Sequence, residues 1–279
     1  MTPGTPVPST AAALRELAAR GEWTGPTAGL LDGYQQANLV VVPHALAFDF
    51  LLYCVRNPKP CPVIAVTEPG DPVVRLGDTT ADLRTELPRY RVWRRGQLID
   101  EPHDITAYWR EDAVGFLLGC SHTFEGPLRR AGVPVRYAAS SAAPAVYVTD
   151  VPTRPAGPLR GPLVVSMRAV PGPLVARAVE VTSRYPTGHG APVHIGDPAA
   201  LGIADLDRPD FGPPPVVEPG DVPVFWACGV TPQLVLPTAA ADYTVTHYPG
   251  HMLVFDHSID VPQDCVTHFI SQHTGQNRR

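Results

Sequence analysis

The stretch NLVVVPHALAFDFLLYCVRNPKPCPVIAV, residues 38–66, decides the fold class. It begins with an apolar run at 38–42, passes through Pro43 into a helix-length segment at 44–55, and reaches a second apolar run at 63–66 after a proline-rich break. Proline suits the first turn of a helix, and short apolar runs suit buried strands. A strand, a helix and a strand in this order predict a parallel pair joined by a right-handed crossover.

Outside this stretch, helix and strand patterns alternate along the chain. Arg95 and Gly96 separate two short segments within 82–99, which predicts a hairpin. Asp104 is a suitable N-cap for a helix at 105–118. Also expected are helices at 11–20, 124–131 and 172–184, strands at 133–137, 145–149, 163–167, 243–247 and 252–256, and a short strand followed by a helix start in each of 189–203 and 221–233.

These elements predict an α/β fold with a mixed sheet and flanking helices, arranged as two lobes around one cleft. A chain of 279 residues suits one large domain or two lobes that share an interface. We expect an N-terminal extension and helix at 1–28, the α/β domain at 29–256, and a C-terminal tail at 257–279.

Composition excludes several classes of function. The 22 basic and 27 acidic side chains give a formal charge of −5, and the arginine pairs do not form a stripe, so nucleic acid is not an expected partner. The 5 cysteines contain no C-x-x-C pair, which disfavours a disulfide framework and predicts a reducing, cytoplasmic location. The longest apolar stretch, near 45–55, is too short to span a bilayer, so no membrane contact is expected. Lys59 is the only lysine, so anions must be bound by arginine, histidine or backbone N–H groups.

The segment 225–232 combines the end of a buried strand with the start of a helix. Cys228 ends the strand, Gly229 allows a close backbone approach, and Thr231 can cap the helix. The positive end of that helix would bind a carboxylate and would lower the pKa of the Cys228 thiol, making it a nucleophile or an acid/base group. The alternative is that Cys228 is a small core residue.

The segment 189–198 offers a set of metal ligands. His189, His194 and Asp197 lie close together in sequence and could hold a divalent metal ion, although they do not share one face of an extended chain. The alternatives are a helix-capping Asp197 and a hydrogen-bonded, buried His194. His189 lies before Gly190 and has no evident structural task.

The segment 119–125, GCSHTFE, places polar groups at a break between two expected helices. Cys120, Ser121 and Glu125 lie there, and burial of Glu125 would raise the pKa of its carboxyl and suit it to proton transfer. The structural alternative is an ordinary helix cap. Arg154 and Arg168 are candidates for binding a substrate carboxylate, although an arginine at a strand end is often salt-bridged or solvated.

Several longer segments point to a known family. In unbroken order across 34–256, the sequence resembles the hydro-lyase family that includes the D-glutamate cyclases. His122 departs from the usual family pattern, in which an aromatic residue stands at this position. The matching segments are QANLVVVP (36–43), AFDFLLYCVRNPKPCP (47–62), DLRTELPRYRVW (82–93), GCSHTFE (119–125), RPAG (154–157), GPLVVSMR (161–168), HGAPVHIGDPAALGI (189–203), VPVFWACGVTPQ (222–233) and PGHM (249–252).

The resemblance implies that a small acidic amino acid, D-glutamate, is cyclised to 5-oxo-D-proline with loss of water, without an organic cofactor. We expect Glu125 and His189 to transfer protons, with Cys228 as a secondary acid or covalent nucleophile and Cys120 beside them. Substrate-binding roles are expected for Ser121, Arg154, Arg168, Thr231 and His251.

Two other functions remain open from the sequence. One is dehydration or hydration of another small hydroxy or amino acid, with a divalent ion held by His189, His194 and Asp197. The other is a non-catalytic amino-acid-binding protein. The sequence is also compatible with a homo-oligomer.

Overall fold

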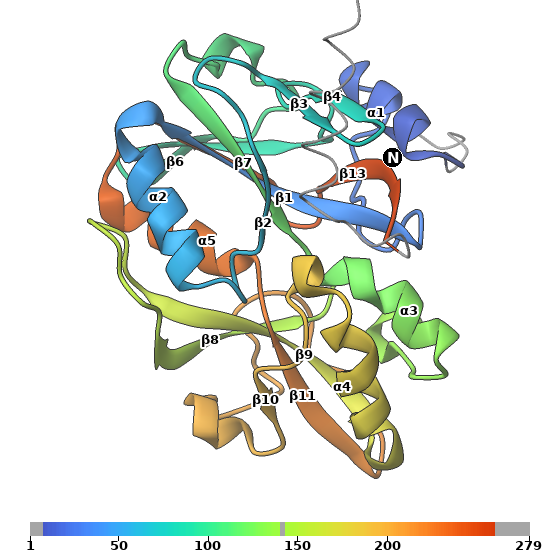
Figure 1. Ribbon diagram of the computed structural model, residues 1–279. Helices are drawn as coiled ribbons and strands as arrows, with labels where there is room; N and C mark the ends of the chain where they lie inside the picture. Colours follow the sequence, from blue (N-terminus) through green and yellow to red (C-terminus); the bar gives the residue numbers. More distant parts are fainter. Residues whose placement is uncertain (1–7, 140–142, 260–279) are drawn as a thin grey trace, which may run out of the picture.

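The computed structural model describes residues 8–139 and 143–259, and two β-sheets form its framework (Figure 1). The larger sheet has the strand order β2-β7-β1-β12-β5-β6, and β13 also pairs with β1. The predicted α/β class is confirmed, and all pairings between the described strands are antiparallel. The strands of the larger sheet are β1 (Tyr34–Pro43), β2 (Val63–Val66), β5 (Tyr90–Arg94), β6 (Gln97–Asp100), β7 (Ala113–Gly119), β12 (Thr244–His247) and β13 (Leu253–Ser258).

Short helices surround the sheets, together with a hairpin formed by β3 (Val73–Leu76) and β4 (Thr79–Asp82). Among the described residues, no helix has the length and apolar character needed to cross a membrane. The α-helices are α1 (Ala11–Ala19), α2 (His44–Arg56), α3 (Glu125–Arg130), α4 (Val175–Ser183) and α5 (Val230–Val235). The 3-10 helices are η1 (Thr106–Tyr108), η2 (Ser121–Phe124), η3 (Arg136–Ala139), η4 (Gly172–Leu174), η5 (Pro186–Gly188), η6 (Pro198–Leu201) and η7 (Leu236–Ala239).

Strand β7 stands where the sequence predicted a helix at 105–118, and that prediction is wrong. Asp104 accepts a hydrogen bond from the Thr106 backbone N–H, but only the single turn η1 follows. The run 113–119 is buried throughout, and hydrophobic periodicity does not separate a fully buried strand from a buried helix. Because β7 lies between β1 and β2 and runs antiparallel to both, β1 and β2 are parallel but not neighbours. The prediction that these two strands pair directly is therefore wrong.

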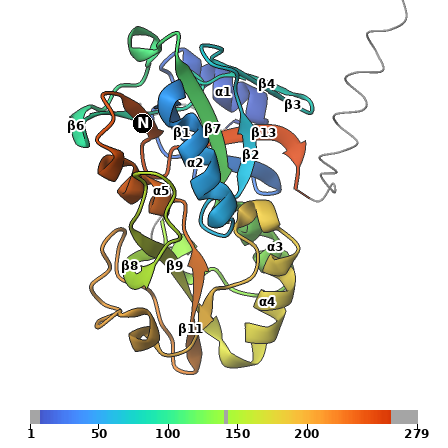
Figure 2. The ribbon, with the colours of Figure 1, turned by 60° about the vertical axis from the view of Figure 1, so that its left-hand side comes forward.

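Strand β1 is apolar throughout its centre because both of its faces are covered. Val40 packs in one core with Phe50 of α2. Val41 points into the opposite core, which includes Val74 of β3 and Ala81 of β4. In Figure 2, α2 lies in front of the strands of the larger sheet, as these contacts require. Burial on two faces explains the continuous hydrophobic run that marks this strand in the sequence.

The smaller sheet has the order β10-β11-β9-β8 and lies below the larger one in Figure 1. Helices α3 and α4 cover one face, where Leu128 and Ala178 pack with Trp226. Leu201 of η6 packs with Phe225 on the other face. Alternating residues of β11 thus serve two cores. The strands are β8 (Ala145–Pro152), β9 (Pro162–Pro171), β10 (His194–Ile195) and β11 (Asp221–Ala227).

Helix α1 packs on the larger sheet through β13. Thr10 caps this helix, because the Ala13 backbone N–H donates to Thr10 Oγ1 over 3.2 Å. Leu14 packs with Val254 of β13. The buried Arg15 donates to the Val254 carbonyl over 2.7 Å and forms ion pairs with two carboxylates, Glu86 and Asp256.

Most other predicted elements are confirmed, including the hairpin of β5 and β6, whose turn residues Arg95 and Gly96 both have positive φ. The strand predicted at 133–137 is wrong, because η3 begins within it. The predicted tail begins in β13, and residues 260–279 lie outside the described residues, as do 1–7. The domain boundaries after residues 28 and 256 and the arrangement in two lobes remain predictions.

Within the described residues, the chain passes between the two main sheets at two places. It leaves the larger sheet after Gly119 at the end of β7, and it returns through Cys228 and Gly229 after β11. Asn38 of β1 lies against both crossings. Its Nδ2 donates to the Gly119 carbonyl over 2.7 Å, and a Cβ on Gly229 would lie 2.2 Å from the same Nδ2. One buried amide therefore joins the two crossings.

This contact predicts that Gly229→Ala is destabilising. The new Cβ would displace the Asn38 amide from the Gly119 carbonyl, so we expect a loss of about 1–3 kcal/mol in the free energy of unfolding, typical of overpacking. Urea unfolding measures it. Gly172→Ala is the matched control, because its nearest neighbour would be 3.4 Å away. Equal losses in the two variants would contradict the prediction.

Candidate active site

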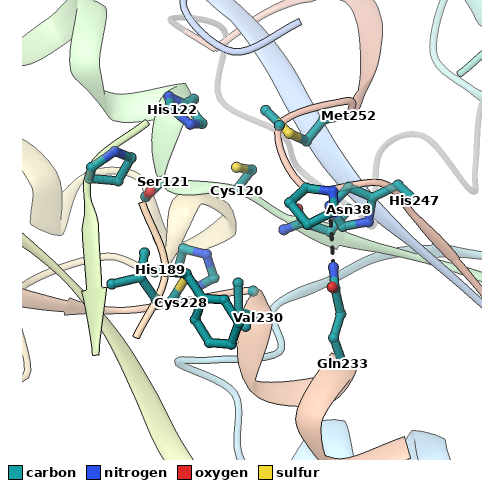
Figure 3. A pocket seen from close by; sticks show the side chains of 16 residues that line it. Asn38, Cys120, Ser121, His122, His189, Cys228, Val230, Gln233, His247 and Met252 are labelled. Atoms are coloured by element: carbon teal, nitrogen blue, oxygen red, sulfur yellow. Dashed lines mark hydrogen bonds between the residues drawn. The ribbon is translucent and has the colours of Figure 1, made fainter. Parts of the chain in front are cut away.

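A cavity of about 110 Å³ lies where the two crossings meet (Figure 3). Its walls come from both sheets and from the segments that connect them. Among the described residues, no arginine, lysine, aspartate or glutamate lines it. The lining residues are Asn38, Cys120, Ser121, His122, Pro144, Val146, His189, Phe211, Cys228, Gly229, Val230, Gln233, His247, Pro249, Gly250 and Met252.

His189 lines this cavity and carries a buried, unpaired imidazole nitrogen. Its backbone is left-handed, with φ 77°, a conformation that few non-glycine residues adopt. Its Nδ1 lies 2.6 Å from the Lys59 carbonyl oxygen, which can only accept, so Nδ1 carries the proton. Nε2 is buried and has no hydrogen-bond partner among the described residues. Burial lowers the pKa of His189 to about 4, and the charge of Arg168 acts in the same direction. His189 is therefore neutral at pH 7, with the Nε2 lone pair free.

A second neutral histidine, His247, lines the cavity from β12. Its Nδ1 lies 3.3 Å from the Leu39 carbonyl oxygen, and its Nε2 lies 3.5 Å from Gln233 Nε2 of α5. Burial lowers the pKa of His247 to about 4. The Gln233 amide donates to this nitrogen. Both ring nitrogens of His247 therefore have hydrogen-bond partners, whereas only Nδ1 of His189 has one.

The thiols of Cys120 and Cys228 both line the cavity, and burial keeps them protonated. Burial raises the pKa of Cys120 to about 12 and also raises the pKa of Cys228. The lowered Cys228 pKa expected from the sequence is wrong in direction. Helix α5 has only 6 residues, and desolvation of the thiolate outweighs any effect of its N-terminus.

Glu125 and Arg168 form a buried ion pair behind the cavity wall and do not line it. Arg168 Nη2 donates to Glu125 Oε1, and the Tyr137 hydroxyl donates to the same oxygen. Burial alone would raise the pKa of Glu125, but its interactions with His122 and Arg168 outweigh burial and hold this pKa well below its usual range. The raised pKa expected from the sequence is therefore wrong in direction.

The ion pair is connected to the cavity through two side chains. Arg168 Nη2 donates to Ser121 Oγ over 3.0 Å, and His122 Nδ1 lies 3.1 Å from Glu125 Oε2. Ser121 and His122 both line the cavity. The charged pair thus fixes two cavity-lining groups without entering the cavity itself.

Three other predicted binding residues lie outside the cavity lining. Arg154 is exposed, and its backbone N–H and carbonyl bond the Asn57 side chain. The Thr231 hydroxyl bonds the backbone of Val164 in β9. His251 Nδ1 lies 2.9 Å from the Pro249 carbonyl oxygen, and burial lowers its pKa. Thr231 and His251 therefore fix backbone that borders the cavity.

The predicted metal ligands are not brought together. His194 Nε2 lies 2.7 Å from the Asp197 carbonyl oxygen, and Asp197 Oδ1 caps η6 by accepting from the Ala199 backbone N–H. His189 lines the cavity without them. The residues that the structure describes contain no group of three histidine, cysteine, aspartate or glutamate side chains arranged to hold a metal.

Four cavity-lining polar groups were missed by the sequence analysis as site residues: Asn38, His122, Gln233 and His247. Asn38 is a polar residue at the start of the otherwise apolar run at 38–42, which is a usable signal. His247 and Gln233 carry no local signal, because only the strand order places β12 next to β1.

The sequence that forms this cavity places the chain in a known class of protein. The D-glutamate cyclase family matches residues 114–256, which include most of the cavity lining, and the chain belongs to this family. Asn38 is the lining residue that precedes the matched region.

Individual relatives extend the similarity over most of the chain. The chain is 55% identical over 245 residues to a protein of Stutzerimonas stutzeri strain A1501 named "Putative hydro-lyase", covering 88% of this chain and 92% of that protein. A Bacillus licheniformis protein with the same description is 54% identical over 243 residues, covering 87% of this chain and 93% of its own. A solved structure of a nitrogen repressor-like protein from Methanococcus jannaschii is 11% identical, with a TM-score of 0.37 and coverage of 90% and 99%, which does not establish a common fold.

The two neutral histidines predict a dependence of stability on pH. Each has a pKa of about 4 in the folded protein and about 6.5 in the unfolded chain, so the unfolded chain binds more protons between these values. The free energy of unfolding should therefore fall as the pH drops from about 6.5 to about 4. In His189→Asn the slope over this range should be smaller by about 1.4 kcal/mol per pH unit, measured by urea unfolding. Identical slopes in the variant and the wild type would contradict a neutral His189.

Proposed function

We propose that the protein is a lyase that dehydrates D-glutamate to 5-oxo-D-proline. The observation that carries the proposal is the free Nε2 of the neutral His189 in the cavity of a D-glutamate cyclase family member. The relatives named as hydro-lyases support the loss of water as the reaction type.

The size of the cavity supports a compact substrate. Its volume of about 110 Å³ has room for several waters, while pockets for drug-sized ligands span ~300–1,000 Å³. The ammonium and γ-carboxyl groups of glutamate belong to one molecule, so the cavity mainly has to hold them in a folded, reactive conformation. Orientation of a tethered nucleophile supplies a large share of the rate in such reactions.

His189 is suited to act as the general base. The ammonium group of the substrate must lose a proton before its nitrogen can attack the γ-carbon. Nε2 of His189 can accept this proton because the Lys59 carbonyl holds the ring with the proton on Nδ1. The protonated thiols of Cys120 and Cys228 are poor nucleophiles, which favours direct attack by the amine over a covalent enzyme intermediate.

Ser121 is suited to bind a substrate carboxylate. Its Oγ accepts a hydrogen bond from Arg168, so its own O–H can donate into the cavity. Arg168 itself is engaged by Glu125 and acts on the substrate only through Ser121. We assign the carboxylate to Ser121 and neutral donors in place of Arg154, which does not line the cavity.

Turnover of D-glutamate by the purified protein tests the proposal, with 5-oxo-D-proline detected by chiral chromatography and L-glutamate as the substrate control. His189→Asn keeps a residue that tolerates positive φ and should lower kcat ~100-fold or more, as loss of a general base does.

His194→Gln is the matched control, because this imidazole lies outside the cavity lining and its loss should leave kcat within about 3-fold of wild type. Dialysis against a chelator tests the divalent ion that the sequence left open. A wild-type protein that forms no lactam, or an equally active His189→Asn variant, would refute the proposal.

A further inference from the structure

We infer that the side-chain amide oxygens of Asn38 and Gln233 form the subsite that holds the substrate ammonium group, and that this subsite selects amino acids over hydroxy acids; the inference rests on the proposed function. Both side chains line the cavity, from β1 and α5, and they are 4% and 8% exposed. Both lie in segments through which the chain resembles its family, 36–43 and 222–233, so the subsite needs no departure from the family pattern.

The amide of Asn38 has one possible orientation. The Gly119 carbonyl oxygen can only accept, so the Asn38 atom that lies 2.7 Å from it is Nδ2. A Cβ on Gly229 would lie 2.2 Å from Nδ2 but 3.5 Å from Oδ1, so the NH₂ group is enclosed between the two glycines. Oδ1 accepts no hydrogen bond from the residues that the structure describes. It is therefore the Asn38 atom left for a ligand.

His247 fixes the amide of Gln233 in the same way. The Leu39 carbonyl oxygen lies 3.3 Å from His247 Nδ1, so Nδ1 carries the proton of this neutral ring and Nε2 accepts. The Gln233 atom that lies 3.5 Å from this Nε2 must then be its nitrogen and not its oxygen. Gln233 Oε1 has no hydrogen-bond partner in the described part of the chain.

The two amides lie on the same part of the cavity wall. His247 contacts Gln233 on one side and, on the other, Leu39, which follows Asn38 in β1. Figure 3 shows Asn38, His247 and Gln233 together, and His189 on a different part of the wall. The amide oxygens and the proposed base therefore approach the cavity from different directions.

An ammonium group fits these atoms in donor count and in charge. It has three N–H donors and no acceptor, and no aspartate or glutamate lines the cavity among the described residues. Buried acceptors without a partner are costly, and N–H groups of a ligand would satisfy them. Two N–H groups would bond the amide oxygens, and the third would meet His189 Nε2. An amide oxygen accepts a hydrogen bond but is a very weak base, so the proton passes to His189.

The same count predicts selectivity against hydroxy acids. A hydroxyl group in place of the ammonium offers one donor instead of three, so at least one of the two buried oxygens would stay unpaired. A site built to hydrogen-bond an N–H group of its substrate discriminates strongly against an analogue that lacks it. The amides of Asn38 and Gln233 thus favour an amino acid over the hydroxy acid that the sequence left open.

Steady-state kinetics on the full-length protein test the subsite. D-Glutamate is the substrate, and glutarate is a competitive inhibitor that keeps both carboxylates but has no ammonium group. The ratio of the Ki of glutarate to the KM of D-glutamate measures the selectivity for the ammonium. Gln233→Met removes the oxygen at similar side-chain size, and we expect this ratio to fall about 10-fold or more. In the wild type, (R)-2-hydroxyglutarate should also bind at least about 10-fold more weakly than D-glutamate.

Gln233→Glu separates a role in binding from a role in structure. It loses the N–H bond to His247, as Gln233→Met does, but keeps an oxygen acceptor, so the ratio should stay at or above the wild-type value. Gln35→Met is the matched control, a buried glutamine outside the cavity lining, whose ratio should stay within about 3-fold of wild type. An equal fall in both Gln233 variants, an unchanged ratio in Gln233→Met, or a wild-type ratio near 1 would overturn the inference and leave the proposed function intact.

Calorimetry separates failure of this inference from failure of the proposed function. If the wild-type protein forms no lactam, the function fails, and the Kd values of D-glutamate and glutarate replace KM and Ki. Tighter binding of D-glutamate that is lost in Gln233→Met would then support the subsite by itself. Equal binding of the two compounds, or binding of neither, would overturn it.

Discussion

The hydrogen bond from Asn38 Nδ2 to the Gly119 carbonyl is the interaction on which the site depends. Gly119 ends β7, where the chain leaves the larger sheet, and Gly229 packs against the same amide where the chain returns. Segments 120–122 and 228–230 are more than 100 positions apart, yet both line one cavity, and the Asn38 side chain is hydrogen-bonded to the first crossing and packed against the second. A buried amide is costly without partners, so its bond also fixes the separation of the crossings.

Burial then determines which groups around the cavity carry charge. The thiols and the imidazoles of His189 and His247 lose their charged forms because water is excluded, and at the thiols this outweighs the opposing charge of Arg168. Glu125 is buried to the same degree but keeps its charge, since Arg168 lies against it. Breaking such a pair leaves an uncompensated buried charge, at a typical cost of ~3–5 kcal/mol. The charges are therefore confined behind the wall, where they orient Ser121 and His122.

The sequence predicted the helices and most strands because local patterns specify them. Pro43 and the apolar run before it marked β1 and α2, and Arg95 with Gly96 marked the hairpin turn. It failed at β7, since a strand buried on two faces loses the alternation that distinguishes it from a helix. That error also concealed the strand between β1 and β2.

The candidate site divides in the same way. Cys120, Ser121, His189 and Cys228 meet in the cavity, and each lies at or next to the end of a strand or a short helix. Arg154 and Thr231 do not line it, and their hydrogen-bond partners, Asn57 and Val164, come from distant parts of the chain. The pKa directions of Glu125 and Cys228 could not be predicted either. They depend on the groups that surround each atom in space, which for Glu125 include Arg168 from another sheet strand.

The uncharged lining bears directly on the proposed chemistry. Glutamate enters with an ammonium and two carboxylates, and the lactam product keeps one carboxylate, so cyclisation removes one charge of each sign. A cavity without a lining arginine, lysine, aspartate or glutamate among the described residues stabilises the charged reactant less than water does. The free-energy cost of holding these charges away from water decreases as the C–N bond forms, because the ammonium and the γ-carboxylate lose their charges. A salt bridge to each end of the substrate would instead favour the reactant and oppose ring closure. Neutral donors such as Ser121, with the ions held one layer behind them, bind the substrate without stabilising the charges that the reaction must remove.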